Sequence, residues 1–196
     1  MKGTFIKDSI PDKIFSLMEG KSFKRNNYIS RNDLSYLVVS HYDFNHKACI
    51  GEIVCNKLIA DSILNVLSEL FASEYEIDKF RLIDYYNADD NLSMADNNSS
   101  SFNFREIAGS DKLSQHAYGL AIDINPLYNP YVKSANQHQI IMPSEATPYV
   151  DRSVDFPHKL WENDICVQTF KKNGFTWGGD WTHAKDYQHF EKTFAK

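Results

Sequence analysis

Apolar and polar residues alternate along this chain in patterns that predict several short secondary-structure elements. Apolar positions three and four residues apart predict a helix over residues 57–74, with Ile59, Ile63, Val66, Leu67 and Leu70 on its buried face. The β-branched and aromatic segment 34–40 predicts a strand, and segment 80–86 predicts a second one. Residues 118–125 alternate strictly between apolar and polar, which predicts a strand with one buried face.

The segments between these elements are more polar. Residues 1–32 predict a loosely structured arm with a short helix at 12–18. Residues 87–103 contain almost no aliphatic side chains and predict a long loop. Residues 126–158 contain five prolines and predict another loop.

The C-terminal part of the chain predicts a helix over residues 159–173, which Gly174 ends. Two short strands are expected after it, around the turn at Gly178 and Gly179. Because helices and strands are interspersed around long loops, the sequence predicts an α+β fold.

Charge and composition exclude several classes of protein. The 196 residues carry 21 basic and 26 acidic side chains, a net charge of −5, which is unfavourable for general binding of nucleic acid or anionic membrane. We therefore expect no nucleic-acid partner. No apolar run approaches the ~18 residues that span a bilayer, so we expect no transmembrane segment. The first residues lack the apolar core and cleavage site of a signal peptide.

Three cysteines are too few for a disulfide framework or a four-cysteine zinc site. Two interpretations stay open. Cys49 and Cys55 could pair, or Cys49, Cys55 and Cys166 are free buried thiols, which is the simpler expectation.

The first candidate chemistry lies in residues 114–125. Asp123 falls between two isoleucines, where burial of a carboxylate is costly unless a partner pairs with it. Small residues on the same strand face, Gly119 and Ala121, leave room for such a partner. His116 precedes the strand and could turn back towards Asp123. Histidine and aspartate are both zinc ligands.

The second candidate lies near the C-terminus. His189 and Glu191 share a strand face, and Asp186 lies three residues before His189. Two histidines, one carboxylate and an open fourth position make the catalytic form of a zinc site. Each residue taken singly is more often structural than catalytic. His183 lies close to Asp186, and we expect a loop histidine there.

Two further features have alternative interpretations. Arg105 is either a surface ion-pairing residue or a group that holds a substrate carboxylate or an oxyanion. Trp177 and Trp181 flank the two glycines and either pack in the core or form a wall of the cleft.

At these positions the sequence resembles the zinc D-alanyl-D-alanine carboxypeptidases of the VanY type. That family also includes peptidoglycan L-alanyl-D-glutamate endopeptidases of phage and bacteria. The motifs are S-x-H-x-x-G-x-A-x-D-I-N at 114–125, G-G-D-W at 178–181 and D-x-x-H-F-E at 186–191. The resemblance extends over about residues 34–191, including 51–54, 82–105 and 124–132.

The resemblance implies a role for each matching residue. His116, Asp123 and His189 match the three ligands of one zinc ion. Asp186 matches the catalytic carboxylate, where many members have glutamate and the endopeptidase-like branch has aspartate. Arg105 matches an arginine that binds substrate or stabilises the transition state.

Other parts of the chain are assigned with less detail. Ser114 occupies the position of a small hydroxyl residue, and with Asn103 and Trp181 it is expected to contact substrate. Residues 1–33 lie outside the resemblance and are expected to form an N-terminal arm before a zinc peptidase domain at 34–196.

The resemblance also implies a fold and an activity. The fold is a small central antiparallel sheet with flanking helices and long loops that hold zinc in an open cleft, as in Hedgehog and DD-peptidase proteins. The activity is hydrolysis of amide bonds in peptidoglycan peptide stems, with Asp186 as the general base. Two alternatives stay open: a carboxypeptidase that removes terminal D-alanine, and a non-catalytic zinc-bearing binding module.

The substrate places the expected site of action outside the cytoplasm, in the periplasm or cell wall or after secretion, or after a phage-type release by lysis. The peptide stems are the expected partner, and we expect a monomer.

Overall fold

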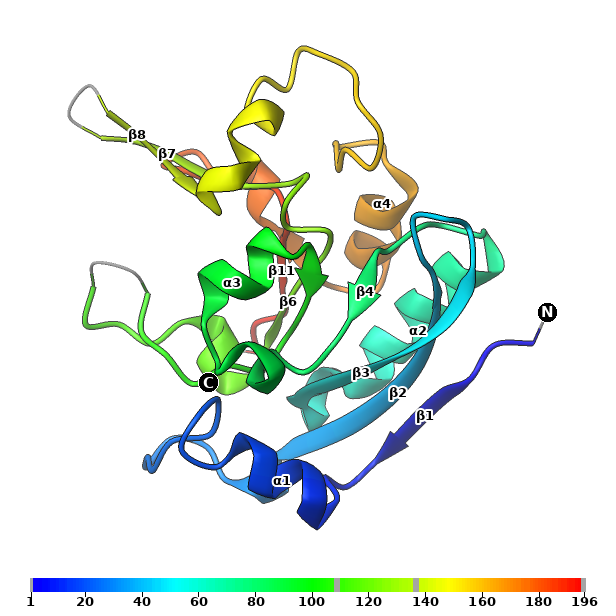
Figure 1. Cartoon of the computed structure of the whole chain (residues 1–196), viewed down its shortest axis with the longest axis vertical. Coiled ribbons are helices and arrows are strands. Elements are labelled where there is room, and N and C mark those ends of the chain that lie inside the picture. The colour runs from blue at the N-terminus through cyan, green and yellow to red at the C-terminus, as the bar shows by residue number, and fades with distance from the viewer. Residues whose placement is uncertain (1, 108–109, 136–137, 195–196) are drawn as a thin grey trace.

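The computed structural model describes residues 2–107, 110–135 and 138–194 (Figure 1). The fold is α+β, with small sheets and few helices. Within the described residues there are three antiparallel three-stranded sheets and one parallel two-stranded sheet. The expected single central sheet is therefore wrong in detail. Strands of only two or three residues, separated by irregular segments, cannot extend one continuous hydrogen-bonded ladder.

The first sheet and the longest helix form the main core. Strands β2 (Leu34–Tyr42) and β3 (Ala48–Asn56) form a hairpin, and helix α2 (Lys57–Ala72) follows directly. The Asn56 side chain accepts a hydrogen bond from the Leu58 amide at 3.0 Å and so caps the helix. The sequence analysis predicted β2 and α2 but missed β3, because Gly51 and Glu52 interrupt its apolar pattern.

The N-terminal segment is more ordered than the sequence predicted. Strand β1 (Phe5–Asp8) pairs antiparallel with β2, so a loosely structured arm is wrong for these residues. Helix α1 (Asp12–Met18) occupies the predicted range. Met18 packs in a second apolar cluster with Phe102, which lies far along the chain. The division into an arm and a domain at residue 33 stays a prediction.

The segment after α2 differs most from expectation. Only β4 (Lys79–Phe80) is extended, and a 3-10 helix occupies Ile83–Tyr86 where a strand was expected. The predicted loop contains α3 (Asp90–Ala95) and β5 (Asn98–Ser99). Asp89 caps the N-terminus of helix α3, because its side chain accepts a hydrogen bond from the Leu92 amide. Buried polar side chains, not aliphatic ones, anchor this region, so a hydrophobic pattern could not reveal it.

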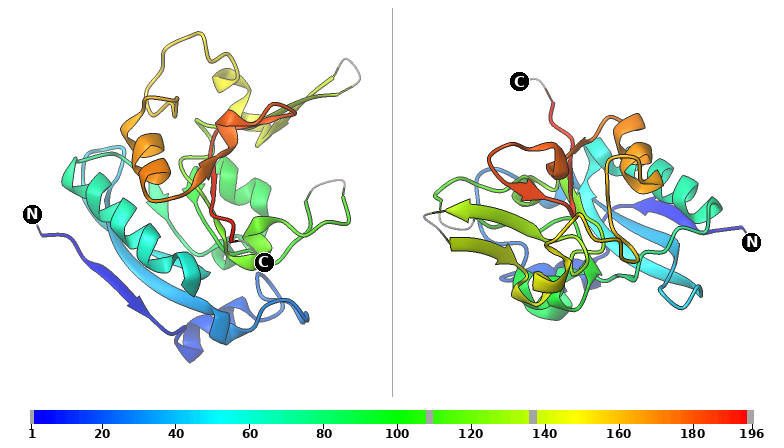
Figure 2. Two further views of the ribbon diagram at one scale, coloured as in Figure 1. Left: turned by 180° about the vertical axis from the view of Figure 1, so that it is seen from behind. Right: turned by 90° about the horizontal axis from the view of Figure 1, so that it is seen from above.

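A projecting hairpin occupies part of the second predicted loop. Strands β7 (Tyr131–Ala135) and β8 (His138–Met142) pair antiparallel, and β10 (Lys185–Asp186) pairs with β7. Figure 2 shows the hairpin extending from the body of the molecule. A 3-10 helix follows at Ser144–Tyr149. Four of the five prolines lie outside these elements and Pro148 lies within the 3-10 helix, so a prediction of loop from proline content alone is wrong here.

The third sheet contains the strands of the candidate site. Its order is β6 (Ala121–Asp123), β11 (His189–Glu191) and β9 (Thr176–Trp177). Helix α4 (Ile165–Lys172) is shorter than predicted because Asp164 caps its N-terminus by accepting from the Cys166 amide at 2.8 Å. Helices α2 and α4 pack against this sheet in one apolar core, to which the sheet contributes Ile122, Trp177 and Phe190.

Cys49, Cys55 and Cys166 are free. Cys49 and Cys55 lie six residues apart on the same extended strand, a separation of ~20 Å along the strand, so they cannot pair. Among the described residues, no helix is long and apolar enough to cross a membrane.

Candidate metal centre and active site

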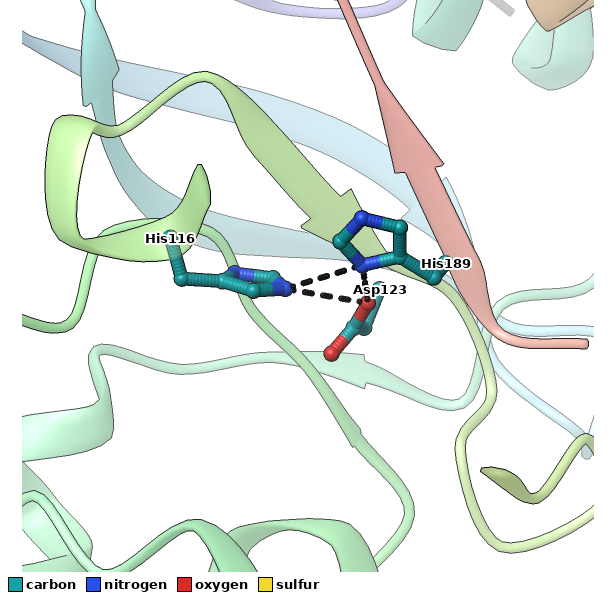
Figure 3. A group of neighbouring side chains, drawn as sticks. All are labelled: His116, Asp123 and His189. Atoms are coloured by element: carbon teal, nitrogen blue, oxygen red, sulfur yellow. Dashed lines mark hydrogen bonds and ion pairs between the residues drawn. The ribbon is translucent and has the colours of Figure 1, made fainter. Parts of the chain in front are cut away.

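Two histidines and an aspartate converge at the edge of the third sheet. His189 and Asp123 are directly opposite each other in the antiparallel register of β11 and β6, so their side chains share a face. His116 comes from the 3-10 helix Gln115–Tyr118 just before β6. One ligand atom from each residue lies within 4.8 Å of the others (Figure 3).

The individual distances define a compact donor set. His189 Nδ1 lies 3.0 Å from Asp123 Oδ1, and His116 Nε2 lies 3.2 Å from the same oxygen. The two inward nitrogens, His116 Nε2 and His189 Nδ1, are 3.2 Å apart. All three residues are buried.

Local sequence explains how His116 reaches this position. The Ser114 side chain accepts from the His116 amide at 3.2 Å and caps the short helix. Gly119 ends that helix with φ +65°, and a Cβ there would lie 2.6 Å from the Asn56 amide nitrogen. Only glycine therefore permits this turn against β3, which redirects the chain into β6.

The outward nitrogens of both histidines also have partners. His116 Nδ1 donates to the Ser101 carbonyl oxygen at 2.6 Å. His189 Nε2 lies 3.1 Å from Glu191 Oε2. Because these partners only accept hydrogen bonds, they hold the protons on the outer nitrogens and leave the inner nitrogens free to bind a metal.

Electrostatics at the site reflect this pairing. Burial alone would raise the pKa of Asp123, but His116 and His189 outweigh it and hold that pKa well below the usual range. Burial lowers the pKa of His189, but hydrogen bonds to Asp123 and Glu191 outweigh burial and raise that pKa to about 10. A metal that binds through His189 must displace a proton from it, so the affinity for the metal increases with pH. The donor set, two nitrogens and one carboxylate, fits a metal ion.

Asp186 brings a second carboxylate to the same place. It lies in β10, opposite Tyr131 of the projecting hairpin. Its Oδ1 is buried and has no hydrogen-bond partner among the described residues. Burial raises its pKa to about 7, His189 opposes this rise and Asp123 adds to it. The residue is half-buried, but a buried oxygen without a partner is costly, and such groups are frequent at functional sites.

Arg105 and Asn103 meet at a third carboxylate. Asp90, at the start of α3, forms an ion pair with Arg105 and accepts from Asn103 Nδ2 at 2.8 Å. The positive charge of Arg105 is one of the smaller contributions that lower the pKa of Asp186. Asn103 is buried, and its Oδ1 has no partner in the described part of the chain. The ion pair that the simpler interpretation predicts therefore exists, and Asn103 links it to the metal-binding group by donating its backbone amide to the His116 carbonyl oxygen at 3.1 Å.

The two tryptophans have different environments. Trp177 is buried in the core and donates from Nε1 to the Tyr187 carbonyl at 2.8 Å. The Trp181 ring lies 5.3 Å from the His189 ring and stacks on His183 at 5.6 Å. Thus Trp181 borders the site. His183 contacts Trp181 and is not part of the metal-binding group.

Sequence reasoning missed Asp90 and the Ser101 carbonyl. Asp90 lies in a helix that was predicted as loop, and a backbone acceptor leaves no signal in sequence. A cavity of about 380 Å³ lies elsewhere, near the end of α2, and is lined by residues such as Glu74, Tyr75 and Trp161. It contains no residue of the metal-binding group.

Comparison with known proteins adds a family assignment for the part of the chain that holds the metal-binding group. Residues 108–192 match the family model described as D-alanyl-D-alanine carboxypeptidase. This segment contains His116, Asp123, Asp186 and His189, whereas Arg105 precedes it. Neither the curated proteins nor the solved structures include a significant match to the chain. The segment that contains the metal-binding group is thus similar to the D-alanyl-D-alanine carboxypeptidase family of peptidases.

Proposed function

We propose that the protein is a zinc metallopeptidase that hydrolyses amide bonds in the peptide stems of bacterial peptidoglycan. The carrying observation is the convergence of two histidines and an aspartate together with a separate half-buried carboxylate, Asp186, whose buried Oδ1 has no partner among the described residues. The family match supports a peptidase acting on this class of substrate.

Zinc is the metal that the donor set favours. His116 Nε2, Asp123 and His189 Nδ1 would supply three ligands and leave a fourth position open, which is the arrangement of catalytic zinc sites. When bound, zinc lowers the pKa of water to ~7 and polarises a carbonyl oxygen.

The side chains around this position would carry the proton transfers. Asp186 Oδ1 takes a proton from the attacking water, and the same carboxyl then gives it to the leaving amine. Its raised pKa suits both steps because the carboxyl can exist in either form near neutral pH. Arg105, held by Asp90, would stabilise the negative charge that develops on the carbonyl oxygen.

Three further residues are proposed to contact the substrate. The unpartnered Oδ1 of Asn103 is an acceptor for a peptide N–H. Trp181 offers an aromatic wall beside His189. Ser114 is the third, although its side chain also caps the turn that carries His116.

The class of bond cleaved has two candidates. An internal bond of the stem is the first, since the D-x-x-H-F-E motif resembles the endopeptidase branch. Removal of a terminal D-alanine is the second, and the description of the matching family favours it. We further propose that the protein is a monomer that meets its substrate outside the cytoplasm, or after lysis.

The test is mass spectrometry of purified muropeptides incubated with the protein, before and after chelation and after zinc is restored. We expect cleavage that chelation abolishes and zinc restores. Asp186→Asn should lose ~10²–10⁴-fold in kcat and keep its zinc. Asp180→Asn is the matched control, because Asp180 lies in the same region but pairs with Lys171.

Stems with free and amidated C-termini distinguish the two bonds, because a carboxypeptidase requires a free terminal carboxylate beside the bond it cleaves. Bound zinc without cleavage of any muropeptide would contradict the proposal and favour a non-catalytic binding module.

A further inference from the structure

Glu191 is a partly buried carboxylate that the proposed reaction does not use. It lies two residues after His189 on β11, so both side chains share one face of the strand. Its cross-strand partner on that face is Ala121, whose small side chain leaves space for Glu191 to lie along the sheet. Its Oε2 reaches to 3.1 Å from His189 Nε2.

The orientation of the His189 ring decides what this contact does. Nδ1 faces Asp123 and His116, at 3.0 Å and 3.2 Å from their nearest ligand atoms. A neutral imidazole carries one proton, and the nitrogen that binds a metal must be the one without it. Metal binding through Nδ1 therefore requires the proton on Nε2.

An ionised carboxylate accepts hydrogen bonds and cannot donate them. A carboxylate at Nε2 therefore selects the ring form with the proton on that nitrogen. The Ser101 carbonyl oxygen acts in the same way on His116, but there it holds the proton on Nδ1 and leaves Nε2 free. The two histidines are thus fixed in different tautomers, one by backbone and one by a side chain that mutation can remove.

We propose that Glu191 is a positioning residue of the metal centre, which accepts a hydrogen bond from His189 Nε2–H and so directs the Nδ1 lone pair at the metal. This inference rests on the metal site of the proposed function. Partners of this kind typically change metal affinity by 10–100-fold when they are removed.

The test is the zinc dissociation constant, measured by competition with a chromophoric chelator for the full chain and its variants. Glu191→Ala should bind zinc ~10–100-fold more weakly. Glu191→Gln should lose less affinity, because its amide oxygen can still accept a hydrogen bond from His189 Nε2–H. Asp180→Asn should bind as the wild type does, since its carboxylate contacts no ligand.

A second measurement separates positioning from general destabilisation. Nitrogen-15 NMR of the zinc-loaded wild type should show His189 bound through Nδ1 and protonated at Nε2. Glu191→Ala should weaken or redistribute that signal while leaving the His116 signal in place. A Glu191→Ala variant with wild-type zinc affinity and an unchanged His189 spectrum would overturn the inference.

The outcomes also separate this inference from the proposed function. Zinc binding without hydrolysis would refute the peptidase and leave the role of Glu191 standing on the affinity difference. Hydrolysis with unchanged affinity in Glu191→Ala would refute the inference alone. A wild-type protein that binds no metal would refute both.

Discussion

Gly178 is the position where the smallest added group should do most damage to the proposed chemistry. A Cβ at this position would lie 2.5 Å from the Asp186 backbone oxygen and 2.8 Å from its Cβ. Ordinary van der Waals contact begins at 3.4 Å. Gly178→Ala therefore requires a relative displacement of about 0.6 to 0.9 Å, and β10 can yield only by straining its pairing with β7.

The size of the effect follows from that displacement. Misplacing a reacting group by ~1 Å costs about 10²-fold in rate. Moving Asp186 by somewhat less should lower kcat/KM by roughly 10- to 100-fold, or about 1.4 to 2.7 kcal/mol of transition-state stabilisation. Zinc affinity should stay close to that of the wild type, because the contact involves none of the three ligands.

The assay is kcat/KM on a defined stem peptide, normalised to folded, zinc-loaded protein. Gly51→Ala is the matched control, because its Cβ would lie 2.4 Å from the Phe80 Cβ, far along the chain from Asp186. Both variants should lose stability, but only Gly178→Ala should lose kcat/KM. Equal kcat/KM in wild type and Gly178→Ala would refute the placement of Asp186 as the proton acceptor.

Three more predictions follow from individual contacts. Asp90→Asn should lower kcat/KM without changing zinc affinity in a chelator competition, because it releases Arg105; unchanged kinetics would argue against that role. Burial lowers the pKa of His41 from 6.5 to about 4 although Asp43 opposes it, so stability should fall by about 3 kcal/mol as pH drops from 6.5 to 4. Urea unfolding across that range should show the loss, and His41→Phe should flatten it. Asn56→Ala should cost about 1 kcal/mol in urea unfolding by removing the cap of α2; a smaller loss than 0.3 kcal/mol would show that the cap is dispensable.

The sequence predicted the elements whose hydrophobic period is long and uninterrupted. Helix α2 and strand β2 have that property, and the structure confirms them. Strand β3 was missed because glycine and glutamate break its alternation, although its partner strand supplies the ladder. Propensity within one segment does not include what the partner strand of a hairpin contributes.

The polar segment 87–103 was the least predictable part of the fold. Its order comes from buried side-chain amides, such as Asn98, which donates to the Arg81 carbonyl at 3.0 Å and to Ser93 Oγ at 2.9 Å. Such networks depend on geometry between segments and have no period along the chain. Loop composition therefore predicted a structureless segment, whereas this segment contains α3 and Asp90, the ion-pair partner of Arg105.

The candidate site shows the same division. His116, Asp123 and His189 were expected from residue type and spacing, and the structure brings them within ligand distance of one another. Their roles as zinc ligands stay predictions, as do those of Asp186 and Arg105. The supports of the site, Asp90 and the Ser101 carbonyl, come from segments that only the fold places nearby.

The central claim is that a metal held by His116, Asp123 and His189 makes this chain a peptidase of peptidoglycan stems. The most direct test is to measure bound zinc and muropeptide cleavage on the same sample, for the wild type and for His189→Ala. The account predicts one zinc per chain with chelator-sensitive cleavage in the wild type, and loss of both in the variant. Cleavage that persists in metal-free protein or in His189→Ala would contradict it.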